Sequence, residues 1–146
     1  MPIEYRIDHE RRLVLAEGYG TVTDEEVFRY QREVWSRSDV AGYDELVDMS
    51  EAREIVEGST ERMRELASLS AEADPPAGGG RFAIVAPHDL TFGVGRMYQA
   101  HRGLNEQSTK EVAEFRERDA ALRWLAGEEP EPGAATPVVP DGKAEA

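Results

Sequence analysis

Residues 81–104 read RFAIVAPHDLTFGVGRMYQAHRGL, and this stretch decides how the chain is expected to fold. Residues 81–86 form a short apolar run between a triple glycine and a proline, which is typical of a buried strand. Asp89 is a suitable N-cap, and apolar side chains then recur at helical spacing through residues 90–104, which predicts a helix with one apolar face. A strand that enters a helix through a short turn is half of a β-α-β unit.

The N-terminal residues predict a β-hairpin. Residues 3–8 alternate between apolar and polar side chains, and residues 13–22 form a second strand after a polar turn. Gly18 and Gly20 lie near the end of this second strand, where they indicate a bulge or a close approach of another backbone.

Strands and helices alternate along the rest of the chain. Thr23 and Glu26 have the spacing of a capping box, which predicts a helix that ends near residues 36–38. The polar residues 50–58 are expected to connect a short strand to a helix capped by Ser59 or Thr60. The elements predicted after the first helix are a strand at 46–49, a helix from 60, the strand and helix within 81–104, a strand at 111–115 and a helix at 117–126.

The element order ββαβαβαβα predicts an α/β fold. We expect a mixed, mostly parallel, five-stranded sheet with an N-terminal β-hairpin and with helices packed on it. Residues 1–126 are expected to form a single domain. Residues 127–146 are rich in Pro, Ala, Gly and Glu, which predicts a disordered acidic tail.

Charge and composition exclude several classes of function. The 146 residues include 30 acids and 17 bases, so the formal net charge of −13 argues against binding nucleic acid or an anionic membrane. The chain has no cysteine, which excludes disulfides, thiolate catalysis and cysteine-ligated metals. No apolar run approaches the ~20 residues that span a bilayer, and no secretory signal is visible, so we expect a cytoplasmic protein without an integral membrane segment.

Few residues suggest catalysis. His9, His88 and His101 do not have metal-ligand spacing, so the sequence predicts no metal site. Gly93 and Gly95 lie inside the predicted helix and lack the third glycine of a dinucleotide-binding turn, so no cofactor is predicted either. His88 follows a predicted strand, where α/β proteins often place functional groups, and it is a candidate acid–base residue beside the acids at the strand ends.

Two sets of residues are candidates for binding. Ser59 and Thr60 are hydroxyls at a helix N-terminus, where a phosphate would be favoured by the helix dipole although Glu57 and Glu61 would repel it. Phe92 is expected in the first turn of its helix, where it could contact a partner or be covered by another helix. Candidate contacts for a ligand or partner are Trp35, Met49, His88, Phe92, Met97 and Tyr98, which would line a pocket or pack in the core.

Three stretches resemble a known family: residues 46–50 (LVDMS), residues 90–98 (LTFGVGRMY) and residues 115–125 (FRERDAALRWL). They are similar to the STAS-like domains of bacterial anti-sigma-factor antagonists and, more closely, to the small SpoIIAA-like proteins, whose shape is related to the CRAL-TRIO lipid-binding fold. The resemblance covers roughly residues 3 to 126. It implies a phosphorylated serine in an Asp-Ser-Ser-Gly motif, but residues 57–60 read EGST and lack that motif.

Three functions therefore compete. The first is a non-catalytic regulatory or partner-binding module that uses the first turns of the helices near Ser59 and Phe92. The second is a small carrier or sensor of an apolar, lipid-like ligand. The third is an enzyme that uses His88 or the acids at the strand ends as acid–base groups. Small mixed sheets of this kind also pair through a helix or an edge strand, so a homodimer is a further expectation.

Overall fold

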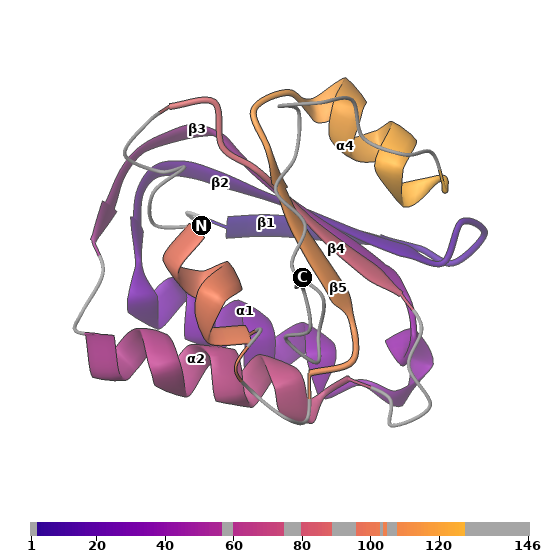
Figure 1. The fold of residues 1–146 in the computed structure, drawn as a ribbon, viewed down its shortest axis with the longest axis horizontal. Coiled ribbons are helices and arrows are strands. Elements are labelled where there is room, and N and C mark those ends of the chain that lie inside the picture. The colour runs from indigo at the N-terminus through magenta and orange to yellow at the C-terminus, as the bar shows by residue number, and fades with distance from the viewer. Residues whose placement is uncertain are drawn as a thin grey trace, which may run out of the picture.

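The computed structural model describes residues 3–56, 60–74, 80–88, 96–102, 104 and 108–127 (Figure 1). The strands are β1 (Ile3–Asp8), β2 (Leu13–Thr23), β3 (Asp44–Val56), β4 (Arg81–Val85) and β5 (Glu111–Phe115). The helices are α1 (Asp24–Trp35), the 3-10 turn η1 (Ser38–Val40), α2 (Thr60–Glu72) and α4 (Arg118–Leu125), and residues 96–102 are also helical. The predicted tail lies outside the described residues, apart from Gly127.

The five strands form one mixed sheet in the order β1-β2-β3-β4-β5. β1 is antiparallel to β2, and all the other neighbouring pairs are parallel. The strand order advances in one direction, so right-handed crossovers keep α1, α2 and the 96–102 helix on the same face of the sheet. Figure 1 shows this layer, with α4 alone on the opposite face. The predicted fold class, including the hairpin, is confirmed.

Each face of the sheet has its own apolar core. On the α1/α2 face, residues such as Val14, Val47 and Phe82 pack beneath the helices. On the other face, Phe115 packs against Trp124 of α4, with ring centroids 5.5 Å apart. Successive residues of a strand point to opposite faces, so both cores draw on the same strands.

Strand β3 is much longer than the sequence pattern predicts. Residues 50–56, expected in a polar connection, continue the strand and pair with β2. The register advances from Glu17↔Asp48 to Tyr19↔Glu51, and again from Gly20↔Ala52 to Thr21↔Glu54, so β3 carries an extra residue at each step. These two bulges interrupt the alternation of apolar and polar side chains, which is why the strand looks like a loop in the sequence.

The two predicted local signals are confirmed. The first register shift falls at Gly18, where an added Cβ would lie 2.6 Å from Met49 Sδ, so the missing side chain permits the close packing. Thr23 Oγ1 accepts a hydrogen bond of 3.3 Å from the backbone N–H of Glu26, so Thr23 caps α1 as predicted, while the Glu26 carboxylate pairs with Arg29.

The helix at residues 96–102 is oriented differently from the prediction. Tyr98, Gln99 and Arg102 are buried, whereas Met97 is 39% exposed and Leu104, just beyond the helix, is 83% exposed. The predicted single apolar face is therefore wrong at Met97 and Leu104, because polar side chains occupy the buried side. In the part of the chain that the structure describes, no helix is long and apolar enough to cross a membrane.

Candidate functional site

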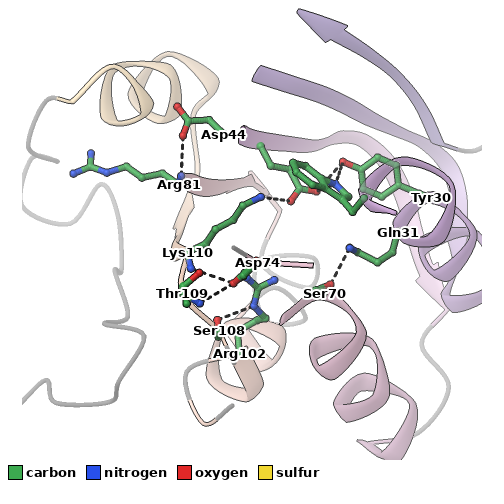
Figure 2. Close-up of polar contacts among 12 residues, drawn as sticks. Tyr30, Gln31, Asp44, Ser70, Asp74, Arg81, Arg102, Ser108, Thr109 and Lys110 are labelled. Carbon is green, nitrogen blue, oxygen red and sulfur yellow. Dashed lines mark hydrogen bonds and ion pairs between the residues drawn. The ribbon is translucent and has the colours of Figure 1, made fainter. Parts of the chain in front are cut away.

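A cluster of polar side chains is buried between the sheet and the helices of the α1/α2 face (Figure 2). We call it the buried polar cluster, and it comprises Tyr30, Trp35, Glu45, Asp74, Tyr98, Arg102, Ser108 and Lys110. Its residues come from α1, the start of β3, the end of the α2 segment, the 96–102 helix and the residues before β5. Four of its members are formally charged, two of each sign.

Asp74 joins three segments of the chain through one carboxylate oxygen. Its Oδ2 atom accepts hydrogen bonds from Arg102 Nη2 at 2.7 Å, from the backbone N–H of Thr109 at 2.8 Å and from the backbone N–H of Lys110 at 3.1 Å. Arg102 also donates to Tyr98 Oη and to Ser108 Oγ. The guanidinium and the carboxylate are thus both well supplied with partners, as buried ions require.

Glu45 forms the second half of the cluster. Its Oε2 atom accepts hydrogen bonds from Tyr30 Oη at 2.7 Å and from Trp35 Nε1 at 3.1 Å. Its Oε1 atom lies 3.9 Å from Lys110 Nζ, and this ammonium also stands 3.6 Å from the centroid of the Trp35 ring. The buried ammonium therefore has both an anionic and an aromatic partner.

Burial dominates the proton affinities in the cluster. It raises the pKa of Glu45, and the nearby Lys110 ammonium opposes that rise. It lowers the pKa of Lys110, opposed in turn by Glu45. Burial likewise raises the pKa of the Tyr30 and Tyr98 hydroxyls. Desolvation thus disfavours charge on both partners of the Glu45–Lys110 pair.

Lysine, glutamate and tyrosine with shifted pKa values are also found in acid–base sites. Here, however, Glu45 and Lys110 lie at the amino ends of β3 and β5. Open α/β sheets bind ligands at the carboxyl ends of the strands. The location, the burial and the internal pairing of the charges all indicate that the cluster holds the helices to the sheet.

A second polar group lies on the opposite face, near the middle of β2 and β3. Arg118, at the start of α4, donates to Asp48 Oδ2 at 2.7 Å and to Glu17 Oε2 at 3.2 Å. Asp48 also accepts from the backbone N–H of Ser50 at 2.9 Å. This group fastens α4 over the sheet. Among the described residues, no set of three or more His, Cys, Asp or Glu side chains could hold a metal ion.

The structure separates the residues that the sequence grouped as contacts. Trp35 and Tyr98 are buried in the polar cluster, while Met97 faces outward. Met49 is half-buried against Gly18, and His88 is exposed just beyond β4. Ser59 and Phe92 lie outside the described residues. Thr60 is the first residue of α2, and its side chain lies outside the described residues too.

Sequence reasoning missed most of the buried polar cluster. Glu45, Asp74, Arg102 and Lys110 are charged types that usually mark a surface, and no motif distinguishes them. One available signal was their position, since Glu45 and Lys110 directly flank strands that were predicted from apolar runs. Glu114 was missed for the same reason, because it is a charged residue that is buried together with its neighbours Ala113 and Phe115 in β5.

Comparison of the sequence with protein-family models and with curated proteins finds no match. Comparison of the structure finds an uncharacterised protein of the DUF3478 family with a SpoIIAA-like fold, from Shewanella loihica PV-4. The two structures superpose with a TM-score of 0.54 over 84% of this chain and 93% of the other, at 18% identity. The chain has a SpoIIAA-like fold. At this identity the likeness shows the fold alone, and the SpoIIAA-like neighbour is itself uncharacterised, so the function must be argued from this chain's own residues.

Proposed function

We propose that this SpoIIAA-like domain is a non-catalytic regulatory module that binds a protein partner. The observation that carries the proposal is the reversed polarity of the segment 96–104. Its inner side consists of Tyr98, Gln99 and Arg102, which are 7%, 1% and 2% exposed. Its outer side presents Met97 and Leu104 at 39% and 83% exposure, with His101 half-buried between them at helical spacing.

This arrangement is costly for an isolated domain. A helix that packs on a sheet normally buries its apolar side and exposes its polar side. Here Tyr98 and Arg102 hydrogen-bond within the cluster, and Gln99 Nε2 donates to the carbonyl oxygen of Val112. The apolar side chains Met97 and Leu104 remain exposed to water. Exposed apolar side chains that gather on one face are typical of protein interaction sites. We call the outer side of Met97, His101 and Leu104 the outer helix face.

The net charge of the chain indicates which kind of partner it can bind. A formal net charge of −13 repels a second copy and attracts a basic surface. We therefore propose a different protein as the partner, with an apolar contact surface and a basic rim. Two further expectations stay predictions. One is that Ser59 and Phe92 contact a partner, and the other is that Ser59 or Thr60 carries a phosphate switch.

The pairing inside the buried polar cluster supports a non-catalytic role. Asp74, Arg102, Glu45 and Lys110 all have partners within the chain, so the fold itself accounts for their presence. An enzyme that uses His88 remains the remote alternative, and replacing His88 with Ala would test it.

Quantitative affinity capture from the native cell extract tests the proposal. We compare the wild type with Leu104→Ser and Met97→Ser, and use Asp119→Asn on the opposite face as the matched control. The expected result is one protein that the wild type and the control recover equally and that both outer-face variants lose, at unchanged thermal stability. Equal recovery by all four proteins would contradict the proposal.

A further inference from the structure

The outer edge of β1 is open. β1 is an end strand of the sheet, and in the part of the chain that the structure describes no other strand pairs with its outer side. A strand at a sheet edge leaves backbone N–H and C=O groups without ladder partners, so another strand can add to it. Charged side chains on the edge often prevent such pairing. The side chains of β1 therefore decide whether this edge repels a further strand or accepts one.

Two opposite charges flank the tyrosine in the middle of β1. Glu4, Tyr5 and Arg6 are all exposed. Neither Glu4 nor Arg6 forms an ion pair or a hydrogen bond with the residues that the structure describes. Glu4 lies opposite another acid, Glu17 of β2, and Arg6 lies opposite Leu15. Like charges in facing positions are unfavourable, so both side chains would gain from a partner of opposite sign.

The same strand of a second copy supplies both partners. In an antiparallel pair that is centred on Tyr5, the two-fold axis places Glu4 of each copy opposite Arg6 of the other. A pair centred on Glu4 would instead place Glu4 opposite Glu4. A pair centred on Arg6 would place Arg6 opposite Arg6, and Glu4 opposite Asp8. Charge therefore selects the register that is centred on Tyr5.

The other side of β1 fits the same register. Tyr5 points to the α1/α2 face, where its ring centroid lies 6.1 Å from that of Tyr30, and it remains 36% exposed. In the register centred on Tyr5, the two Tyr5 rings are neighbours, and Ile3 of each copy faces the half-buried Ile7 of the other. Aromatic and β-branched side chains that face each other across two strands stabilise a sheet. Both sides of β1 thus favour one pairing.

We propose that two copies of this chain join through their β1 strands, in an antiparallel pair centred on Tyr5, so that one sheet continues through both domains. The formal net charge of −13 opposes this association at long range. Salt screens that repulsion beyond about 8 Å at physiological ionic strength, whereas the contacts between Glu4 and Arg6 are local. The outer helix face has no such pair of opposite charges, so a second copy fits β1 and not that face. This pairing goes beyond the proposed function and does not depend on it.

Sedimentation velocity of the full chain over a range of protein concentrations tests the pairing. We expect a weak dimer, because a single short strand buries little area, and we expect more dimer at about 0.15 M salt than at about 0.01 M. Glu4→Arg and Arg6→Glu should each raise the dimer dissociation constant at least about tenfold, since each places like charges opposite each other. Glu10→Arg makes the same change in net charge as Glu4→Arg but in the exposed turn after β1, and it should dimerise at least as well as the wild type.

A mixture of the two β1 variants gives the sharpest result. When Glu4→Arg meets Arg6→Glu, every facing pair again has opposite signs, so the mixture should form the dimer that neither variant forms alone. A folding defect in either variant could not produce this restoration.

Three results would overturn the proposal. They are a wild type that stays monomeric at physiological salt, which would mean that the charges protect the edge, single variants that dimerise like the wild type, and a mixture that stays monomeric. Leu104→Ser should dimerise like the wild type, so the failure of this pairing and the failure of the proposed partner binding are distinguishable.

Discussion

The Asp74 carboxylate lies 2.7 Å from the Arg102 guanidinium, and both side chains are 2% exposed. The same carboxylate oxygen accepts the backbone N–H groups of Thr109 and Lys110. One side chain after α2 thus positions both the 96–102 helix and the residues that lead into β5. The outer helix face depends on this contact, because Arg102 fixes which side of the helix is buried.

Replacement of Asp74 should strongly lower the stability of the fold. Asp74→Ala leaves the Arg102 charge buried without its anion and removes the acceptor of two backbone N–H groups. We expect the free energy of unfolding to fall by about 3–5 kcal/mol, measured by urea denaturation. Glu61→Gln, which removes an exposed partner of Arg64, should change it little. A loss of less than about 1 kcal/mol for Asp74→Ala would contradict the role given to Asp74.

The Glu45–Lys110 pair should show strong coupling. Lys110→Met leaves a buried carboxylate without its cation, and we expect it to cost about 3 kcal/mol. Adding Glu45→Gln removes that uncompensated charge and keeps an oxygen acceptor for Tyr30 and Trp35. The double variant should therefore be more stable than the sum of the single effects by at least about 1 kcal/mol, in a double-mutant cycle. Strict additivity would mean that the two groups do not interact.

Stability should fall with rising pH because of Glu114. The native carboxyl keeps its proton up to about pH 8, whereas the unfolded carboxyl releases it near its usual pKa of 4.5. Between these values the native state binds more protons than the unfolded state, so the free energy of unfolding decreases as pH rises. Glu114→Gln removes this contribution and should be more stable than the wild type above pH 8, by at least about 1 kcal/mol.

Thermal unfolding of both proteins across this pH range measures the effect. The two melting temperatures should be closest below the unfolded pKa and should diverge as pH rises. Parallel pH profiles for the wild type and Glu114→Gln would show that Glu114 is ionised in the folded protein at neutral pH.

Gly80 should tolerate no side chain. Its φ of +87° favours glycine, and an added Cβ would lie 3.0 Å from the carbonyl oxygen of Tyr43 and 3.2 Å from that of Gly42. Gly127 also has a positive φ, of +102°, but an added Cβ there meets nothing within 4 Å. Gly80→Ala should therefore cost about 2 kcal/mol or more, and Gly127→Ala about 1 kcal/mol. Equal losses in chemical denaturation would refute the steric argument.

The elements of the fold could be predicted where local patterns are strong. The hairpin, the cap at Thr23 and the strand at 111–115 follow from alternation and capping, which act over a few residues. The length of β3 could not be predicted, because two bulges break its alternation and only pairing with β2 reveals the strand.

The candidate sites were much harder to predict. Arg102 and Lys110 are buried only because Asp74 and Glu45 meet them from distant segments, and no local signal reports such pairing. The same pairing turns the polar side of the 96–102 helix toward the sheet. Met97 and Leu104 do have helical spacing, but they lie on the exposed side and not on the buried side that their apolar character predicts. Long-range electrostatics thus override local hydrophobic periodicity in this part of the chain.

The proposed binding of a protein partner by the outer helix face is tested most directly with a site-specific photo-crosslinker at position 104. Leu104 is 83% exposed, so the substitution should leave the fold intact. We predict that the probe at position 104 captures one protein in the native extract and that an excess of unlabelled wild type abolishes the crosslink. The same probe at position 119, on α4, should not capture that protein. Identical crosslinking from positions 104 and 119, or none from position 104, would contradict the claim.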